Sequence, residues 1–127
     1  PAGTVSSLES SLAEAAVLRY SGSLAEAATV CRKVLVQLEA LANSETPPQL
    51  LTAVAWNELS LIQALLGEPQ AAHQSALTAW QIYTALLGPD APVVTRLEGN
   101  LAELARQLPL EARQQFEGFL EQALDRA

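Results

Sequence analysis

The chain has one cysteine and few aromatic residues, and both shortages limit what it can be. Cys31 has no partner for an intramolecular disulfide, and a zinc site built on cysteine pairs is excluded. Aromatic residues make up 5% of the chain and apolar residues 50%, so the core must consist mainly of Leu, Ala and Val. We expect Cys31 to be a small buried side chain on a helix. A nucleophilic role is disfavoured, because no motif ties it to His73, the only histidine.

Long apolar runs are also missing. No run approaches the ~20 residues that a membrane span needs, and no charged segment followed by an apolar one marks a signal peptide. These observations predict a cytoplasmic protein with no membrane partner. The chain starts at Pro1 without a methionine, so we keep open that it is a fragment of a longer protein.

Basic residues are absent from the whole middle of the chain. Residues 34 to 95 contain no Lys or Arg, and the formal net charge is −7. An acidic middle disfavours nucleic-acid backbones and anionic membrane surfaces as ligands. The simple interpretation is solubility. The sharper interpretation is a neutral or basic protein or peptide partner.

Motifs that carry catalysis or hold a cofactor are missing too. No nucleophile signature lies near His73, and we expect this residue at an exposed or turn-facing helix position. Glu117 and Glu121 are four residues apart, but no Glu-x-x-His motif accompanies them, so solvated surface charge is the simpler interpretation. Glycine motifs that cradle phosphate are not found. The sequence therefore predicts a protein that is not an enzyme and needs no metal or cofactor.

What the sequence does contain is an internal period of 45 residues. The turn at 43–47 corresponds to the turn at 88–92, and each follows an apolar helical run. The same offset matches Gly22 with Gly67, Ala27 with Ala72, Leu38 with Tyr83, and Leu41 with Leu86. A period of this size is typical of stacked structural repeats.

Apolar residues recur at helical spacing in six segments, which are separated by short turns. Because the turns are short, sequential helices should be antiparallel neighbours. No stretch of Ser, Gly or Pro is long enough to link two domains. The pattern predicts one all-α domain over residues 1–127, with hairpins at about 6–42, 47–87 and 91–126.

The middle hairpin has a characteristic order of large and small residues. Its first helix carries Trp56, Leu59 and Ser60, its turn carries Gly67, and its second helix carries Ala72, Ala76 and Ala79. Two helices approach closely where side chains are small, and a large residue opposite fills the space between them. This order resembles the tetratricopeptide repeat.

The stretch 86–92, followed by 100–104, is similar to the long-loop, kinesin-light-chain-like subgroup of that family. Two positions depart from the pattern. Glu14 falls where a leucine is expected, and Pro109 arrives three residues before the position that matches Gly67, so the fifth helix should be one turn shorter. The resemblance implies a right-handed α-solenoid of about six helices.

The resemblance also implies a scaffold that binds a peptide or protein segment in a concave groove, lined by the first helix of each hairpin. Asparagine there can both donate to and accept from a peptide backbone, and arginine can fork onto a carboxylate. For the asparagines, hydrogen bonding within the array is an equal alternative. The selected positions are Arg19, Val54, Asn57, Leu61, Arg96, Asn100, Glu103 and Arg106.

A second hypothesis is self-association through the last helix. If nothing covers Phe116, Phe119 and Leu120, they would form a homodimer surface or a docking face for further repeats. Trp80 and Tyr83 lie one turn apart, and for them core packing between hairpins is favoured over an aromatic anchor for a partner.

Overall fold

The computed structural model describes residues 4–44 and 47–126, and the side chains of 119–120 and 123–126 lie outside that description. Within it the chain forms helices and no strand. The helices are α1 (Val5–Tyr20), α2 (Leu24–Ala40), α3 (Gln49–Leu65), α4 (Pro69–Leu87), α5 (Pro92–Ala105) and α6 (Leu110–Arg126). The prediction of an all-α chain with about six helices is confirmed.

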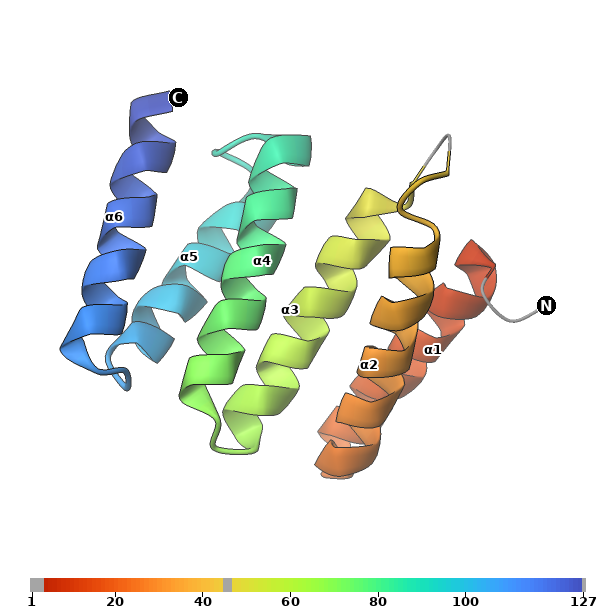
Figure 1. The fold of residues 1–127 in the computed structure, drawn as a ribbon. Coiled ribbons are helices and arrows are strands. Elements are labelled where there is room, and N and C mark those ends of the chain that lie inside the picture. Colours follow the sequence, from red (N-terminus) through yellow and green to blue (C-terminus); the bar gives the residue numbers. More distant parts are fainter. Residues whose placement is uncertain (1–3, 45–46, 127) are drawn as a thin grey trace.

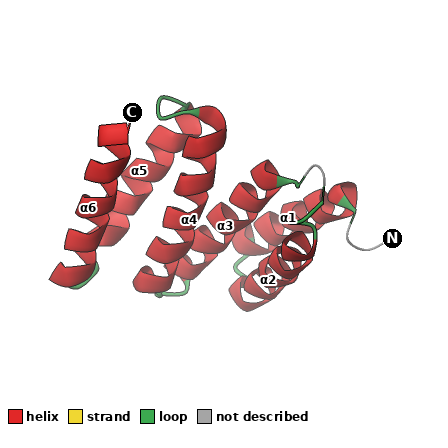
Figure 2. Cartoon of the chain, turned by 45° about the horizontal axis from the view of Figure 1, so that its top comes forward, coloured by secondary structure: helices red, strands yellow, loops and turns green. Residues whose placement is uncertain are grey.

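The helices follow one another across the molecule in chain order, each antiparallel to the one before it (Figure 1). Most contacts join helices that are neighbours in the sequence, and α1 also contacts α3. Helices α1 and α6 therefore lie at opposite ends of the row (Figure 2). In both views α3 lies between α2 and α4, which positions the groove described below.

The α1–α2 and α3–α4 turns are built in the same way. Gly22 and Gly67 have φ of 88° and 77°, a backbone conformation that favours glycine because it has no Cβ. The amide that follows each glycine donates to the carbonyl oxygen five residues before it, at 2.9 Å in both turns. This is the hydrogen bond of a Schellman helix end. The 45-residue period of the sequence is thus also a period of backbone hydrogen bonds.

The buried apolar residues form two clusters that meet at α3. The N-terminal cluster packs α1 and α2 against one side of α3, and its fully buried members include Leu8, Cys31 and Ile62. Burial raises the pKa of the Cys31 thiol to about 12. The expectation of a small buried side chain at Cys31 is confirmed.

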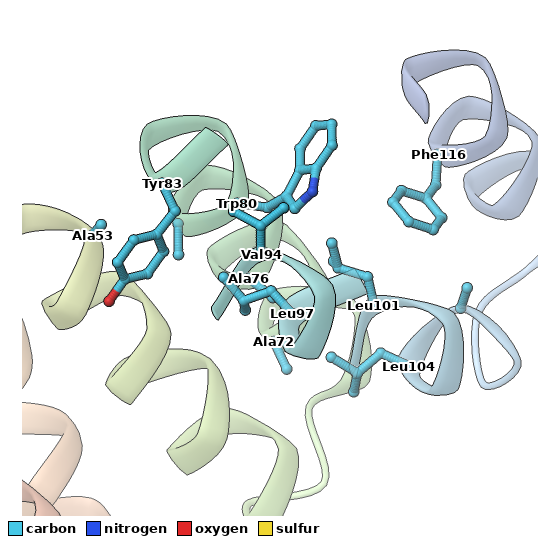
Figure 3. Packing of buried hydrophobic residues seen from close by; sticks show 12 residues of the cluster. Ala53, Ala72, Ala76, Trp80, Tyr83, Val94, Leu97, Leu101, Leu104 and Phe116 are labelled. Carbon is cyan, nitrogen blue, oxygen red and sulfur yellow. The ribbon is translucent and has the colours of Figure 1, made fainter. Parts of the chain in front are cut away.

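The C-terminal cluster joins α3, α4, α5 and α6 (Figure 3). Three small residues along α4 are fully buried in it: Ala72, Ala76 and Ala79. Their size lets α4 approach α3 closely, and this pair of helices shares the most extensive contact in the molecule. Ser60 adds a buried hydrogen bond, its hydroxyl donating to the carbonyl of Ala72 at 2.8 Å.

Trp80 and Tyr83 lie in the same C-terminal cluster (Figure 3). The indole N–H of Trp80 donates to Glu98 Oε2 at 3.1 Å, which satisfies its polar edge and ties α4 to α5. The core interpretation of both residues is confirmed.

The shortening predicted for the fifth helix is also present. Helix α5 has 14 residues and α3 has 17. Proline lacks an amide N–H and clashes with the turn before it, so the helix ends ahead of Pro109.

Two expectations at the C-terminal end need correction. His73 is buried, with 6% of its surface exposed, where the sequence predicted an exposed or turn-facing position. The cause is Phe116 of α6, whose ring meets the imidazole edge to face at a centroid distance of 4.9 Å. Phe116 is itself buried in the C-terminal cluster, so it does not form part of an exposed self-association surface. The side chains of Phe119 and Leu120 lie outside the described residues.

Candidate functional site

The central helix α3 exposes a stripe of apolar side chains. Leu50, Val54 and Leu65 are 50%, 38% and 60% exposed, and Leu61 is half-buried. Successive spacings of four, seven and four residues place them along one side of the helix. That side faces away from the residues that α3 buries in the two clusters. We call these four residues the α3 stripe, which is a candidate interaction surface.

Asn57 lies within the α3 stripe. Its side chain is half-buried, and its Oδ1 atom is buried with no hydrogen-bond partner among the described residues. A buried carbonyl oxygen of this kind is costly unless a donor reaches it. The Asn57 Oδ1 atom is therefore a buried acceptor beside Val54 and Leu61, closed to solvent in this arrangement.

Arg19 reaches the same region from α1 but is already engaged. Its Nε donates to Glu58 Oε2, and its Nη2 donates to Oε1 at 3.3 Å. The two side chains are 15% and 11% exposed, and the Glu58 carboxylate raises the pKa of the Arg19 guanidinium. The structure thus brings Arg19 to α3 as a link between helices, and the pair spans 39 residues of sequence.

The four selected residues of α5 lie in solvent. Arg96, Asn100, Glu103 and Arg106 are all exposed. Arg106 pairs with Glu103 at 3.0 Å, but both side chains are more than half exposed, so the pair adds little stability. Within the described part of the chain, no hydrogen bond or ion pair joins these residues to the α3 stripe.

A groove of about 1210 Å³ lies on the other side of α3, between α2 and α4. We call it the α2–α4 groove. Helix α3 contributes Thr52, Trp56 and Gln63 to its lining. By helical spacing these three residues lie on the side of α3 opposite to Val54 and Leu61. None of the positions selected from the family resemblance lines this groove.

The α2–α4 groove combines an apolar base with amide and hydroxyl groups. Leu35, Trp56 and Ile82 are half-buried in it. The polar lining includes Gln49, Thr52, Gln74, Thr78 and Gln81. Sequence reasoning missed this site because, along each helix alone, these polar residues look like an ordinary solvated face.

Two charged residues line the α2–α4 groove, and they have opposite signs. Arg32 and Glu39 both come from α2 and are exposed. The groove is therefore neutral as a whole, unlike the chain, whose net charge is −7.

Neither a metal cluster nor a membrane helix is found in the described residues. Over 4–44 and 47–126, no three His, Cys, Asp or Glu side chains are grouped so that they could share a metal ion. In the same ranges every helix is too short or too polar to cross a bilayer.

Comparison with known proteins adds no family. No protein-family model matches the chain, and no curated protein matches it significantly.

Proposed function

We propose that this protein is a non-catalytic interaction module that binds a peptide or protein segment on the side presented by α1, α3 and α5. We further propose that its helices form a right-handed solenoid of the tetratricopeptide type. The equivalent hydrogen bonds of the α1–α2 and α3–α4 turns support a repeated unit. The buried alanines of α4 support the same packing scheme.

The observation that carries the binding proposal is the α3 stripe. Burying apolar surface contributes roughly 25 cal/mol per Å², so a partner that covers these side chains gains several kcal/mol before entropic costs. The exposed Arg96 and Asn100 provide polar contacts on α5. The acidic net charge favours a neutral or basic segment.

A display library of random linear peptides, selected on the whole chain, tests this proposal. Binders that depend on the α3 stripe should lose at least tenfold in affinity on the variant V54E/L65E. Leu110→Glu is the matched control, because Leu110 is an equally exposed leucine on another helix, 63% exposed against 60% for Leu65. Circular dichroism verifies that both variants are folded. The proposal fails if every selected peptide binds V54E/L65E as tightly as the original chain.

Self-association through α6 is the competing hypothesis. It loses its main support because Phe116 packs on His73 within the same chain. A dimer through this face would have to use other residues of α6.

A further inference from the structure

We propose that the α2–α4 groove is a second docking site, and that its occupant is an extended peptide segment of a partner protein. The segment has apolar side chains between one acidic and one basic residue. This site is separate from the α3 stripe, since the two lie on opposite sides of α3. A failure of the proposed function at the α3 stripe would therefore leave the proposal for the α2–α4 groove unchanged.

The size of the groove fits a peptide. Its volume of about 1210 Å³ exceeds the range of roughly 300–1,000 Å³ that is typical of small-molecule sites. The apolar base formed by Leu35, Trp56 and Ile82 can bury the side chains of such a segment. Trp56 is suited to this role because tryptophan often anchors protein interfaces.

The polar lining favours an extended segment over a helix. A helix satisfies its own backbone groups, whereas an extended chain presents unpaired N–H and C=O groups that need partners. Gln49, Gln74 and Gln81 each carry both donor and acceptor atoms on the lining of the groove. These amides can pair with both the N–H and the C=O groups of an extended backbone.

The threonine hydroxyl groups in the lining have a defined direction of hydrogen bonding. Thr52 donates to the carbonyl of Pro48 at 3.1 Å, and Thr78 donates to the carbonyl of Gln74 at 3.0 Å. Each hydroxyl proton is thus used within its own helix, and the oxygen lone pairs are left to accept from an occupant.

A buried glutamine supplies a fixed donor. The hydroxyl of Ser75 donates to Gln63 Oε1 at 2.7 Å, and both residues are buried. This bond fixes which end of the amide is the acceptor for Ser75. It leaves the Nε2 amide of Gln63 as the donor toward the groove that the residue lines.

Arg32 and Glu39 determine the charge pattern of the occupant. They are seven residues apart on α2, which is two helical turns and about 10 Å along the axis. An extended chain covers that distance in about three residues, at roughly 3.3 Å each. A complementary segment therefore carries its acidic and basic residues three positions apart, with apolar residues between them.

The test uses nine-residue linear peptides selected from a display library on the whole chain. Peptides are retained if they bind V54E/L65E as tightly as the original chain, which removes ligands of the α3 stripe. We expect the retained peptides to carry an acidic and a basic residue three positions apart. On Arg32→Glu, an exposed position at which folding should not suffer, their affinity should fall about tenfold. Exchanging the acidic residue of the peptide for lysine should restore binding to Arg32→Glu.

Several results would overturn the inference. One is that no peptide survives the filter. Another is that the survivors lack the charge pattern or bind Arg32→Glu unchanged. If the retained peptides are helical by circular dichroism, the occupant of the groove is a helix and not an extended segment. A dimer in light scattering that Arg32→Glu dissociates would identify a second copy of the chain as the occupant.

Discussion

The first two hairpins and the α5–α6 pair join antiparallel helices by different means. The α1–α2 and α3–α4 turns each contain a glycine with positive φ and a matching set of backbone hydrogen bonds. The described α5–α6 turn has no residue with positive φ. Over the part of the chain that the structure describes, α5 and α6 share less contact than the other neighbouring helix pairs. Helix α6 is instead anchored by Phe116 on His73 of α4. Among the described residues, the first two hairpins thus share one type of turn, whereas α6 is held by the packing of Phe116 against the C-terminal cluster and His73.

Among the substitutions that test this comparison, Phe116→Ala has the largest expected effect on stability. Removing a buried phenylalanine costs about 3 kcal/mol or more, and we expect most of that loss to appear as undocking of α6. Hydrogen exchange measured by mass spectrometry should show faster exchange in α6 with little change in α1 to α4. Ile62→Ala, which empties a fully buried position of the N-terminal cluster, should speed exchange in α1 to α5 instead. If Phe116→Ala accelerates exchange evenly along the chain, the two regions are not separable.

A smaller effect is expected at the turn glycines. Gly67→Ala places a Cβ on a residue with φ of 77°, which should destabilise the chain by roughly 1–2 kcal/mol. Gly22→Ala should cost the same if the two turns are equivalent. Gly99 is the matched control. It lies within α5, and a Cβ added there would meet no neighbouring atom within 4 Å, so Gly99→Ala should stabilise by about 0.5–1 kcal/mol.

Urea unfolding of these three glycine variants provides the measurement. If Gly22→Ala and Gly67→Ala lower the free energy of unfolding by different amounts, the two turns differ in backbone strain although their hydrogen bonds are alike. If Gly99→Ala also lowers the free energy of unfolding, glycines in turns and in helices do not differ in the way expected.

The smallest expected effect is a pH dependence at the α4–α6 contact. Burial lowers the pKa of His73 below its ordinary value of 6.5, so the folded state favours the neutral ring. The stabilisation is fully present above the unfolded pKa of about 6.5 and is lost as pH falls from there through the lower folded pKa. Urea unfolding between pH 7.5 and 5.5 should show this loss in the original chain and not in His73→Gln. Equal slopes for the two chains would assign the pH dependence to other groups.

The sequence predicted the parts of this fold that are encoded locally. Helical spacing and turn residues were enough to place six helices and to match Gly22 with Gly67. Large and small residues at helical spacing were enough to predict core positions for Cys31, Trp80 and Tyr83. The early end of α5 followed from Pro109, because the restriction that proline imposes is local too.

Contacts between distant segments could not be predicted in the same way. The sequence predicts an exposed or turn-facing position for His73, because Phe116, which covers it, lies 43 residues further along the chain. Arg19 was selected as a ligand-binding residue, although it pairs with Glu58 on another helix. The α2–α4 groove depends on how far two helices are held apart by a third, and no residue pattern within one helix records that distance.

Trp56 lies where these features meet. It is half-buried, packs against both apolar clusters and also lines the α2–α4 groove. Neither cluster is complete without this side chain, so loosening one removes packing from the other. The thermodynamic consequence is cooperativity: α1 to α5 should melt in a single transition, although their contacts are mostly between neighbours. The indoles of Trp56 and Trp80 give that transition an intrinsic fluorescence signal, and a segment seated in the groove would perturb the contribution of Trp56.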